Sequence, residues 1–236
     1  MSMSGLRTDT IVTRRKPLFA SVVFDADSTL ASIEGIDWLA ALRGEEVGRA
    51  VQELTTRAMV GELSLEDVYA LRLDAIRPTR NEIALLSAAY VSAIEPGAAQ
   101  LCAELRQAEV ALAIVSGGLR DALLPLAEKL GLDATEVHGV ELRFDERGYY
   151  VSLAEAQPLA KQTGKPFVVR NLSLQRPSVM VGDGSTDAAV RGATDAFIAY
   201  TGVARREPIV ALADAEARNF DELCSLLFAP AAANHE

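Results

Sequence analysis

The sequence is poor in cysteine and histidine, and it has no long uninterrupted apolar run. Two cysteines, Cys102 and Cys224, stand among 236 residues, too few for a disulfide framework or a thiolate metal site. The two histidines, His138 and His235, leave no histidine-rich zinc site. No segment approaches the roughly 18 consecutive apolar residues of a membrane-spanning helix. We therefore expect neither a disulfide-rich domain, nor a histidine-bound zinc centre, nor a membrane span.

Positive charge is also scarce. The chain has 23 lysines and arginines against 33 aspartates and glutamates, which gives a formal net charge of −10. An acidic surface repels nucleic acid backbones and anionic lipid headgroups, so neither nucleic acid nor a membrane is expected as a partner. A small anionic substrate stays compatible with this charge, because a bound metal ion can reverse the field inside one cleft.

The N-terminal segment contains Arg14 and Arg15 ahead of an apolar run, which superficially resembles a twin-arginine export signal. That run is interrupted by Asp25 and Asp27 before it reaches the length of a signal's apolar region. We therefore expect a cytoplasmic protein in which residues 1–16 form a loose leader.

Short β-favouring apolar runs alternate with helical segments over most of the chain. Strands are expected at 18–24, 108–116, 178–182 and 196–200, a hairpin-like stretch at about 137–151, and helices near 97–108 and 119–131 and from about 164 and 185. This alternation predicts an α/β fold, a doubly wound, Rossmann-like parallel sheet with helices on both faces.

Residues 33–93 break the alternation, because they are helical throughout. Ser64, three residues before the carboxylate of Asp67, predicts a helix start, and Pro78 predicts a break before the next helix. So long a helical block does not fit into a strand-to-strand crossover. We therefore expect a small helical cap domain at 33–93, inserted into an α/β core domain of residues 17–32 and 94–236.

Polar side chains follow three of the expected strands. They are Asp25 and Asp27 after the first strand, Ser116, followed by Gly117, at the end of the second, and Asp183 and Asp187 after the strand at 178–182. The carboxyl ends of parallel strands meet at one edge of the sheet, where open α/β sheets bind their ligands. Carboxylates that converge there repel one another unless a hard cation neutralises them. Mg²⁺ is the natural candidate.

The same residues suit phosphoryl transfer. Ser116, the neighbouring glycine amides and Lys165 offer donors for phosphate oxygens. Asp25 can attack phosphorus and form an aspartyl-phosphate, while Asp27 can protonate the leaving oxygen and later activate water. We therefore expect a Mg²⁺-dependent phosphomonoester hydrolase.

The chain resembles the haloacid dehalogenase superfamily of phosphohydrolases, in its phosphoserine phosphatase branch. The resemblance extends from about Leu18 to Asp214. It rests on the segments VVFDADSTL, SIEGID, AMVG, LRL, IVSGGLR, EAQPLAKQTGKP and MVGDGSTDAA, in that order. The resemblance implies hydrolysis of a small phosphorylated metabolite, O-phospho-L-serine, to serine and phosphate, a reaction of serine biosynthesis.

The resemblance also implies a role for each matching residue. Asp25 is the expected nucleophile and Asp27 the general acid and base. The expected Mg²⁺ ligands are Asp25, the backbone carbonyl of Asp27, and Asp183, with Asp187 in support; the expected phosphate ligands are Ser116, Gly117 and Lys165. Glu34 would pair with the substrate ammonium, Arg72 would grip its carboxylate, and Met59 and Gly61 would line the lid.

Departures from the family pattern concern the lid and the substrate. Val60 stands where a second glycine is expected, and Leu65 stands where the family often has an aromatic residue. Arg205 and Arg206 lie in a region that sometimes contacts substrate, and the sequence does not say which of them does so here.

Plainer structural roles compete with several of these assignments. Lys161 is a rival for Lys165, Arg72 could instead pair with Glu66 or Asp67, and Asp183 and Asp187 could cap a helix. Glu34 could complement a helix dipole. Another small phosphomonoester as substrate, a phosphotransferase, and a catalytically silent phospholigand-binding protein are the alternative functions. A dehalogenase is disfavoured, because carbon–halogen cleavage needs neither Asp27 as an acid nor a Mg²⁺ cluster.

Overall fold

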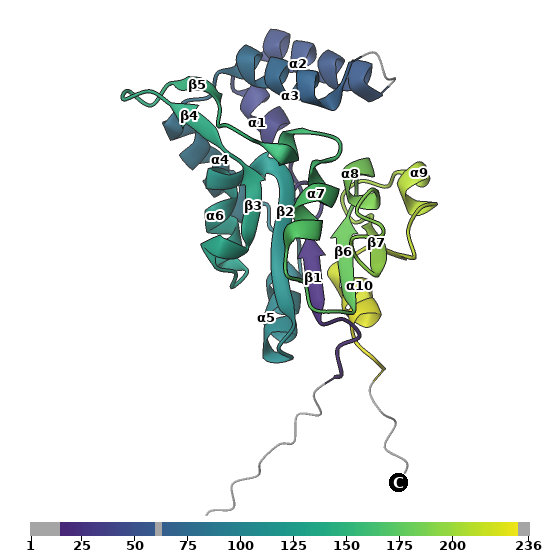
Figure 1. The fold of residues 1–236 in the computed structure, drawn as a ribbon. Coiled ribbons are helices and arrows are strands. Elements are labelled where there is room, and N and C mark those ends of the chain that lie inside the picture. Colours follow the sequence, from purple (N-terminus) through teal and green to yellow (C-terminus); the bar gives the residue numbers. More distant parts are fainter. Residues whose placement is uncertain (1–14, 60–62, 231–236) are drawn as a thin grey trace, which may run out of the picture.

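The structure, a computed structural model, describes residues 15–59 and 63–230. Its centre is a six-stranded parallel sheet in the order β3-β2-β1-β6-β7-β8. The strands are β1 (Ser21–Phe24), β2 (Ala111–Leu119), β3 (Val137–Val140), β6 (Ser178–Gly182), β7 (Ala196–Tyr200) and β8 (Ala215–Ala217). A two-stranded antiparallel hairpin of β4 (Leu142–Phe144) and β5 (Tyr150–Leu153) stands apart from this sheet (Figure 1).

The chain order of the strands reverses between β1 and β6. From β1 the chain builds outward through β2 to β3, then returns to β6 on the other side of β1 and continues to β7 and β8. In an open parallel sheet such a reversal leaves a crevice outside the carboxyl ends of the two central strands. The carboxyl ends of β1 and β6 are therefore the place where this fold positions a site.

Helices cover both faces of the sheet. They are α5 (Ala98–Gln107), α6 (Arg120–Lys129), α7 (Gly164–Asn171), α8 (Ser185–Ala188), α9 (Glu207–Val210) and α10 (Phe220–Leu227), with short 3₁₀ helices η1 (Ala134–Glu136) and η2 (Pro158–Ala160). Helix α10 packs against α5, and α7 packs against α8. The central strands are apolar because both faces are covered: Val22, Val23 and Phe24 of β1 are fully buried. This sheet with its inserted helices confirms the predicted fold class.

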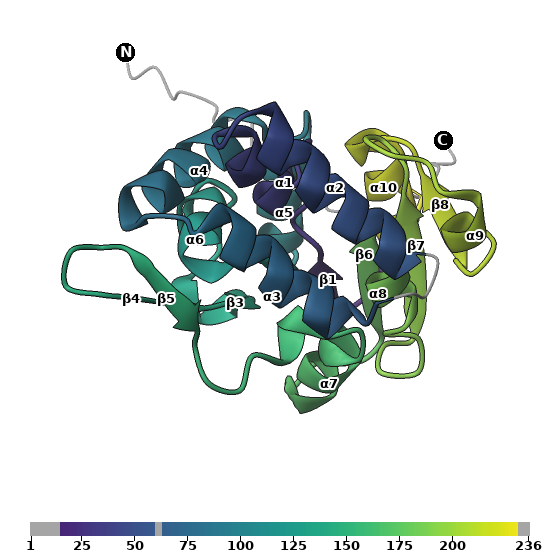
Figure 2. The same cartoon turned by 90° about the horizontal axis from the view of Figure 1, so that it is seen from above.

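In the described part of the chain, four helices lie between β1 and α5: α1 (Gly35–Ala41), α2 (Glu45–Met59), α3 (Leu65–Ile76) and α4 (Arg80–Ser92). Helices α1, α2 and α3 lie over the carboxyl ends of the central strands, and α4 runs beside α6 (Figures 1 and 2). The predicted helix starts are present, because Ser64 accepts a hydrogen bond from Asp67 N–H and Thr79 forms a capping box with Glu82.

Several details differ from the sequence-based expectations, and one is that β2 spans Ala111–Leu119 and not 108–116. The first strand begins at Ser21 and not at residue 18, because Leu18 N–H bonds to the carbonyl of Leu227 instead. The stretch at 137–151 is only partly a hairpin, since β3 pairs with β2 in the main sheet. Strand β8 was not anticipated, since only three residues form it. Within the described residues, no helix has the length and apolarity needed to cross a bilayer.

Candidate active site

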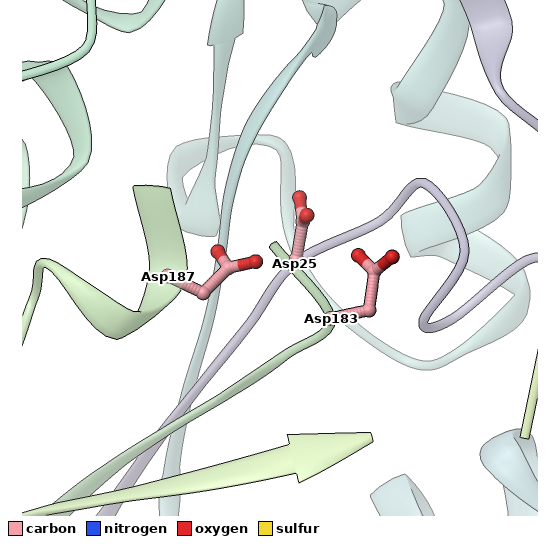
Figure 3. Close-up of side chains that lie close together, drawn as sticks. All are labelled: Asp25, Asp183 and Asp187. Atoms are coloured by element: carbon pink, nitrogen blue, oxygen red, sulfur yellow. The ribbon is translucent and has the colours of Figure 1, made fainter. Parts of the chain in front are cut away.

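Three buried carboxylates meet at the edge predicted from the sequence. Asp25 directly follows β1, Asp183 directly follows β6, and Asp187 lies in the first turn of α8. Each offers an oxygen, and these oxygens all lie within 4.8 Å of one another. Figure 3 shows the three side chains close together at the ends of the two strands. The prediction that residues distant in sequence gather here is confirmed.

Parallel pairing of β1 with β6 is the reason that Asp25 and Asp183 meet. Phe24 is paired with Val181, and the Asp25 N–H donates to the carbonyl of Val181 at 2.9 Å. Asp187 reaches the same place because Gly182 has no side chain. A Cβ added at Gly182 would lie 2.3 Å from Cγ of Asp187. The Asp187 carboxylate also accepts the Gly184 N–H at 2.9 Å, so it caps its own helix as well.

Lys165 supplies positive charge inside this cluster. Its Nζ lies 2.8 Å from Oδ2 of Asp25 and 2.6 Å from Oδ1 of Asp187, and its side chain is 5% exposed. Burial alone would lower the pKa of Lys165, but the charges of Asp187 and Asp25 outweigh burial and raise that pKa. The rival, Lys161, is half-exposed and pairs with Glu66 at 3.4 Å. The structure therefore puts Lys165, and not Lys161, in the site.

Asp27 lies beside the cluster with its own set of donors. Its Oδ1 accepts a hydrogen bond from the hydroxyl of Tyr90 and a longer one, 3.3 Å, from the Gly35 N–H. Burial, followed by the charges of Glu34 and Asp25, raises the pKa of Asp27 to about 8. A carboxyl group with such a pKa keeps its proton at neutral pH, which is the form that a general acid needs.

The pKa of Asp187 is raised as well, to about 7. Burial is the main cause and the charge of Asp25 adds to it, while Lys165 acts in the opposite direction. Burial is the largest cause of the raised pKa values of Asp27 and Asp187, and the charges of neighbouring carboxylates add to it. Such a cluster gains from a further cation.

Ser116 and Gly117 lie at the same edge, on β2. The register pairs Phe24 with Ile114, which brings Ser116 to the level of the Asp25 loop. Ser116 is fully buried, and its Oγ accepts the Gly118 N–H at 3.0 Å. The carbonyl of Gly117 accepts a hydrogen bond from the Tyr69 hydroxyl of α3 at 2.7 Å. The first of these hydrogen bonds lies within β2, and the second joins β2 to α3.

Glu34 is the residue before α1, and Arg72 lies on α3, which packs against α1. The Glu34 carboxylate accepts a hydrogen bond from Ser28 Oγ at 2.7 Å, and burial is the main cause that raises its pKa. Arg72 forms an ion pair with Asp37, one helical turn after Glu34. The alternative partners for Arg72 are engaged elsewhere. Glu66 pairs with Lys161, and Asp67 accepts a hydrogen bond from Ser64.

The structure describes only some of the expected lid residues. Gly61 lies outside the described residues, as does Val60, and the structure places Met59 at the end of α2 without describing its side chain. The expected leader at residues 1–16 also lies almost wholly outside the described part.

Three residues at the site were missed in the sequence, Tyr69, Tyr90 and Asp37, and the choice between Arg205 and Arg206 was left open. The guanidinium of Arg206 forms an ion pair with Oδ2 of Asp183, without the geometry of a hydrogen bond. Arg205 points elsewhere and pairs with Glu216 at 2.9 Å. Arg206 is therefore the arginine of that pair that reaches the site. No sequence signal distinguishes the two, and a lone tyrosine on a helix is typical of core packing.

Comparison with known proteins identifies the family. Residues 22–190 match the model of the haloacid dehalogenase-like hydrolases. Phosphoserine phosphatase of Mus musculus is 36% identical over 200 residues, which are 82% of this chain and 88% of the mouse protein. The chloroplastic phosphoserine phosphatase of Arabidopsis thaliana is 34% identical over 212 residues, which are 88% of this chain and 71% of the plant protein.

A solved structure agrees with these sequence matches. The crystal structure of a phosphoserine phosphohydrolase-like protein from Francisella tularensis superposes with a TM-score of 0.78 at 26% identity, covering 87% of this chain and 98% of that chain. The substrate-bound phosphoserine phosphatase complex, at 24% identity and a TM-score of 0.73, shares the fold. The chain therefore belongs to the haloacid dehalogenase-like hydrolase family, in its phosphoserine phosphatase branch.

Proposed function

We propose that this chain is a Mg²⁺-dependent phosphatase that hydrolyses O-phospho-L-serine to serine and phosphate. The observation that carries the proposal is the buried cluster of Asp25, Asp183 and Asp187 with Lys165 held against Asp25. The relatives named phosphoserine phosphatase support the choice of substrate. The proposal also includes a role in serine biosynthesis and a cytoplasmic location.

The cluster fits a divalent cation. Oδ2 of Asp183 is buried and makes no hydrogen bond among the described residues, where its partner is the ion-paired Arg206, and the nearby carboxyls of Asp27 and Asp187 have raised pKa values. These are hard oxygen donors in a dry site, the set that Mg²⁺ prefers. Asp25, Asp183 and the main-chain carbonyl of Asp27 would hold the ion, with Asp187 in support. A bound ion would neutralise charge between an anionic nucleophile and an anionic ester.

The reaction steps are assigned to residues of this chain. Asp25 attacks phosphorus, and the bond from phosphorus to the serine oxygen breaks as the aspartyl-phosphate forms. Asp27 gives its proton to the departing oxygen, then takes one from the water that hydrolyses the intermediate. Ser116, the Gly117 N–H and Lys165 bind the phosphoryl oxygens, and Lys165 holds Asp25 in place beforehand.

Recognition of the amino acid part is assigned to Glu34 and Arg72. Nε of Arg72 is buried without a hydrogen-bond partner among the described residues, although the same guanidinium pairs with Asp37. A buried donor left unpaired costs about 1–3 kcal/mol, which a substrate carboxylate would recover. Glu34 would accept the ammonium group, and Met59 and Gly61 would line the lid.

The domain division belongs to the proposal as well. Residues 33–93 would form a cap over a core domain of 17–32 and 94–236, with 1–16 as a leader. Two contacts join the α3 segment to the core near the site: the Tyr69 hydroxyl to the Gly117 carbonyl, and Glu66 to Lys161. Such contacts suit a cap that encloses the substrate.

Phosphate release from O-phospho-L-serine by the purified chain tests the proposal. We expect turnover with Mg²⁺, its loss with EDTA and its return with added Mg²⁺. Asp25→Asn should abolish turnover while circular dichroism shows an intact fold. Metal-independent turnover would remove the cofactor assignment, and near-normal activity of Asp25→Asn would remove the nucleophile.

The same assay separates the competing functions. A better substrate in a panel of small phosphomonoesters would keep the chemistry and replace phosphoserine. Preferential capture of the phosphoryl group by methanol or serine over water would indicate a transferase. Phosphoserine binding without phosphate release, with Mg²⁺ present, would indicate a silent binding protein.

A further inference from the structure

Tyr90 is a buried tyrosine whose hydroxyl reaches the acid of the proposed reaction. It lies on α4, its side chain is fully buried, and its hydroxyl donates a hydrogen bond to Oδ1 of Asp27. Burial is the largest cause that raises the pKa of Tyr90 well above its ordinary value. The hydroxyl therefore stays protonated and acts as a donor to Asp27.

Two glycines make room for this hydroxyl. A Cβ added at Gly35 would lie 2.1 Å from Oη of Tyr90, and one added at Gly118 would lie 3.2 Å from it. Gly35 opens α1, and Gly118 lies on β2, two residues after Ser116. The hydroxyl thus sits in a space bounded by α1, β2 and Asp27, three parts of the chain that meet at the site.

Both hydrogen bonds to the Asp27 side chain end on the same carboxyl oxygen. The Tyr90 hydroxyl and the Gly35 N–H donate to Oδ1, and among the described residues no donor is recorded for Oδ2. A carboxyl group held through one oxygen has a fixed rotation, with the other oxygen free. That is the arrangement needed by an acid that must meet a leaving oxygen within hydrogen-bond reach.

We propose that Tyr90 is a positioning residue that fixes the Asp27 carboxyl so that Oδ2 delivers the proton to the leaving group. This inference rests on the proposed function, and it assigns a role that the phosphate and metal ligands do not have. Tyr90 itself does not touch the substrate. Loss of its hydroxyl therefore weakens proton transfer and leaves phosphoryl binding in place.

The hydrogen bond has a plainer explanation, since a buried tyrosine hydroxyl needs a partner and Asp27 is near. The two explanations differ in what they predict for leaving groups. A purely structural hydroxyl affects all substrates alike. A hydroxyl that positions an acid matters for a poor leaving group, which must be protonated, and matters little for a good one.

The test is the Tyr90→Phe variant, which keeps the ring and removes only the hydroxyl. We measure kcat/KM with Mg²⁺ for phosphoserine, phenyl phosphate and p-nitrophenyl phosphate, since kcat/KM reports transition-state stabilisation relative to free enzyme and substrate. Phenyl and p-nitrophenyl phosphate bind through similar rings, but phenol is the poorer leaving group. We expect losses of about 10- to 100-fold for phosphoserine and phenyl phosphate, and of less than about threefold for p-nitrophenyl phosphate.

Tyr200→Phe is the matched control. Tyr200 is likewise buried, and its hydroxyl donates at 2.7 Å to the carboxylate of Glu95, which is not one of the proposed catalytic residues. We expect this variant to change kcat/KM by the same small factor for all three substrates. Asp27→Asn is the positive reference and should show the leaving-group effect more strongly than Tyr90→Phe.

Equal losses on phenyl and p-nitrophenyl phosphate, or no loss on either, would overturn the role of Tyr90. If Tyr90→Phe does not fold, Gly35→Ala displaces the same hydroxyl from the other side and must show the same leaving-group effect. The wild-type chain is measured in parallel. Absence of wild-type turnover overturns the proposed function, whereas normal wild-type turnover with an indifferent Tyr90→Phe overturns the inference alone.

Discussion

Nζ of Lys165 lies 2.8 Å from Oδ2 of Asp25, and both side chains are less than a tenth exposed. The same nitrogen also binds Asp187, so one buried ammonium serves two buried carboxylates. A buried charge without its partner is expensive, and the removal of one partner from such a pair typically costs about 3–5 kcal/mol. Lys165 therefore stabilises the fold as well as the arrangement of the nucleophile.

Lys165→Met tests both roles. We expect phosphate release to fall at least about 100-fold, because a donor to the phosphoryl group and to Asp25 is lost. We expect the free energy of unfolding, measured by urea titration without metal, to fall by about 3 kcal/mol, and added Mg²⁺ to recover part of it. Lys161→Met is the control. Lys161 is half-exposed and pairs with Glu66, so its loss should cost less than about 1 kcal/mol and little activity. Equal effects of the two variants would contradict the assignment.

Arg72→Ala should separate recognition from chemistry. Because the buried Nε of Arg72 has no partner among the described residues, a substrate carboxylate is its natural acceptor. We expect kcat/KM for phosphoserine to fall about 100-fold, in line with a lost charged hydrogen bond. For p-nitrophenyl phosphate, which has no carboxylate, we expect a change of less than about threefold. Arg72→Lys keeps the positive charge but cannot bind a carboxylate in bidentate fashion. Its kcat/KM for phosphoserine should therefore lie between the values of wild type and Arg72→Ala. Similar losses on both substrates would remove Arg72 from substrate recognition.

Much of the site could be predicted because it depends on strand ends. A short, wholly apolar run such as Val22–Phe24 is typical of a strand covered on both faces, and a carboxylate directly after it must emerge at the sheet edge. The same reasoning places Asp183 after β6. The choice between Lys165 and Lys161 was harder, because it depends on which lysine is buried. The packing of helix α7 and of the loop before it determines which one is buried.

The rest depends on contacts between distant elements, which spacing does not encode. Tyr90 is one apolar-face residue of a helix, and the sequence does not show that its hydroxyl reaches Asp27, 63 positions away. Asp37 and Arg72 are likewise brought together only by the packing of α1 against α3. Strand β3 was misjudged because four residues containing His138 and Gly139 have too weak a pattern, and its pairing with β2 decides the outcome.

The replacement of glycine by alanine should have opposite effects at two nearby helical positions. At Gly48, inside α2, an added Cβ meets nothing within 4 Å, so Gly48→Ala should stabilise the fold by about 0.5–1 kcal/mol through the helix propensity of alanine. At Gly35 the added Cβ collides with Tyr90, so Gly35→Ala should destabilise by about 1–3 kcal/mol. Thermal melts of both variants against wild type give the comparison. Stabilisation by both substitutions would show that Tyr90 does not occupy the space beside Gly35.

The pair of Arg43 and Glu82 should make stability depend on acid. Arg43 donates to both carboxylate oxygens, at 2.5 and 2.7 Å, and Thr79 N–H donates at 2.7 Å. The hydrogen bonds from Arg43, followed by those from Thr79, lower the pKa of Glu82 from 4.5 to about 2. Because the pKa is lower in the folded state, the stabilisation is fully present above pH 4.5 and disappears as the pH falls towards 2.

Glu82→Gln isolates this charge, because glutamine has a similar shape and is accepted at the same place in a capping box. We expect the free energy of unfolding of wild type to exceed that of the variant by roughly 1–2 kcal/mol at pH 6–7. This figure is reduced for solvent screening, because the pair is partly exposed. The difference should shrink steadily between about pH 4.5 and pH 2 in urea titrations, since both chains then carry a neutral side chain there. A difference that stays constant with pH would mean that the shape of the side chain, and not its charge, joins the end of α1 to the start of α4.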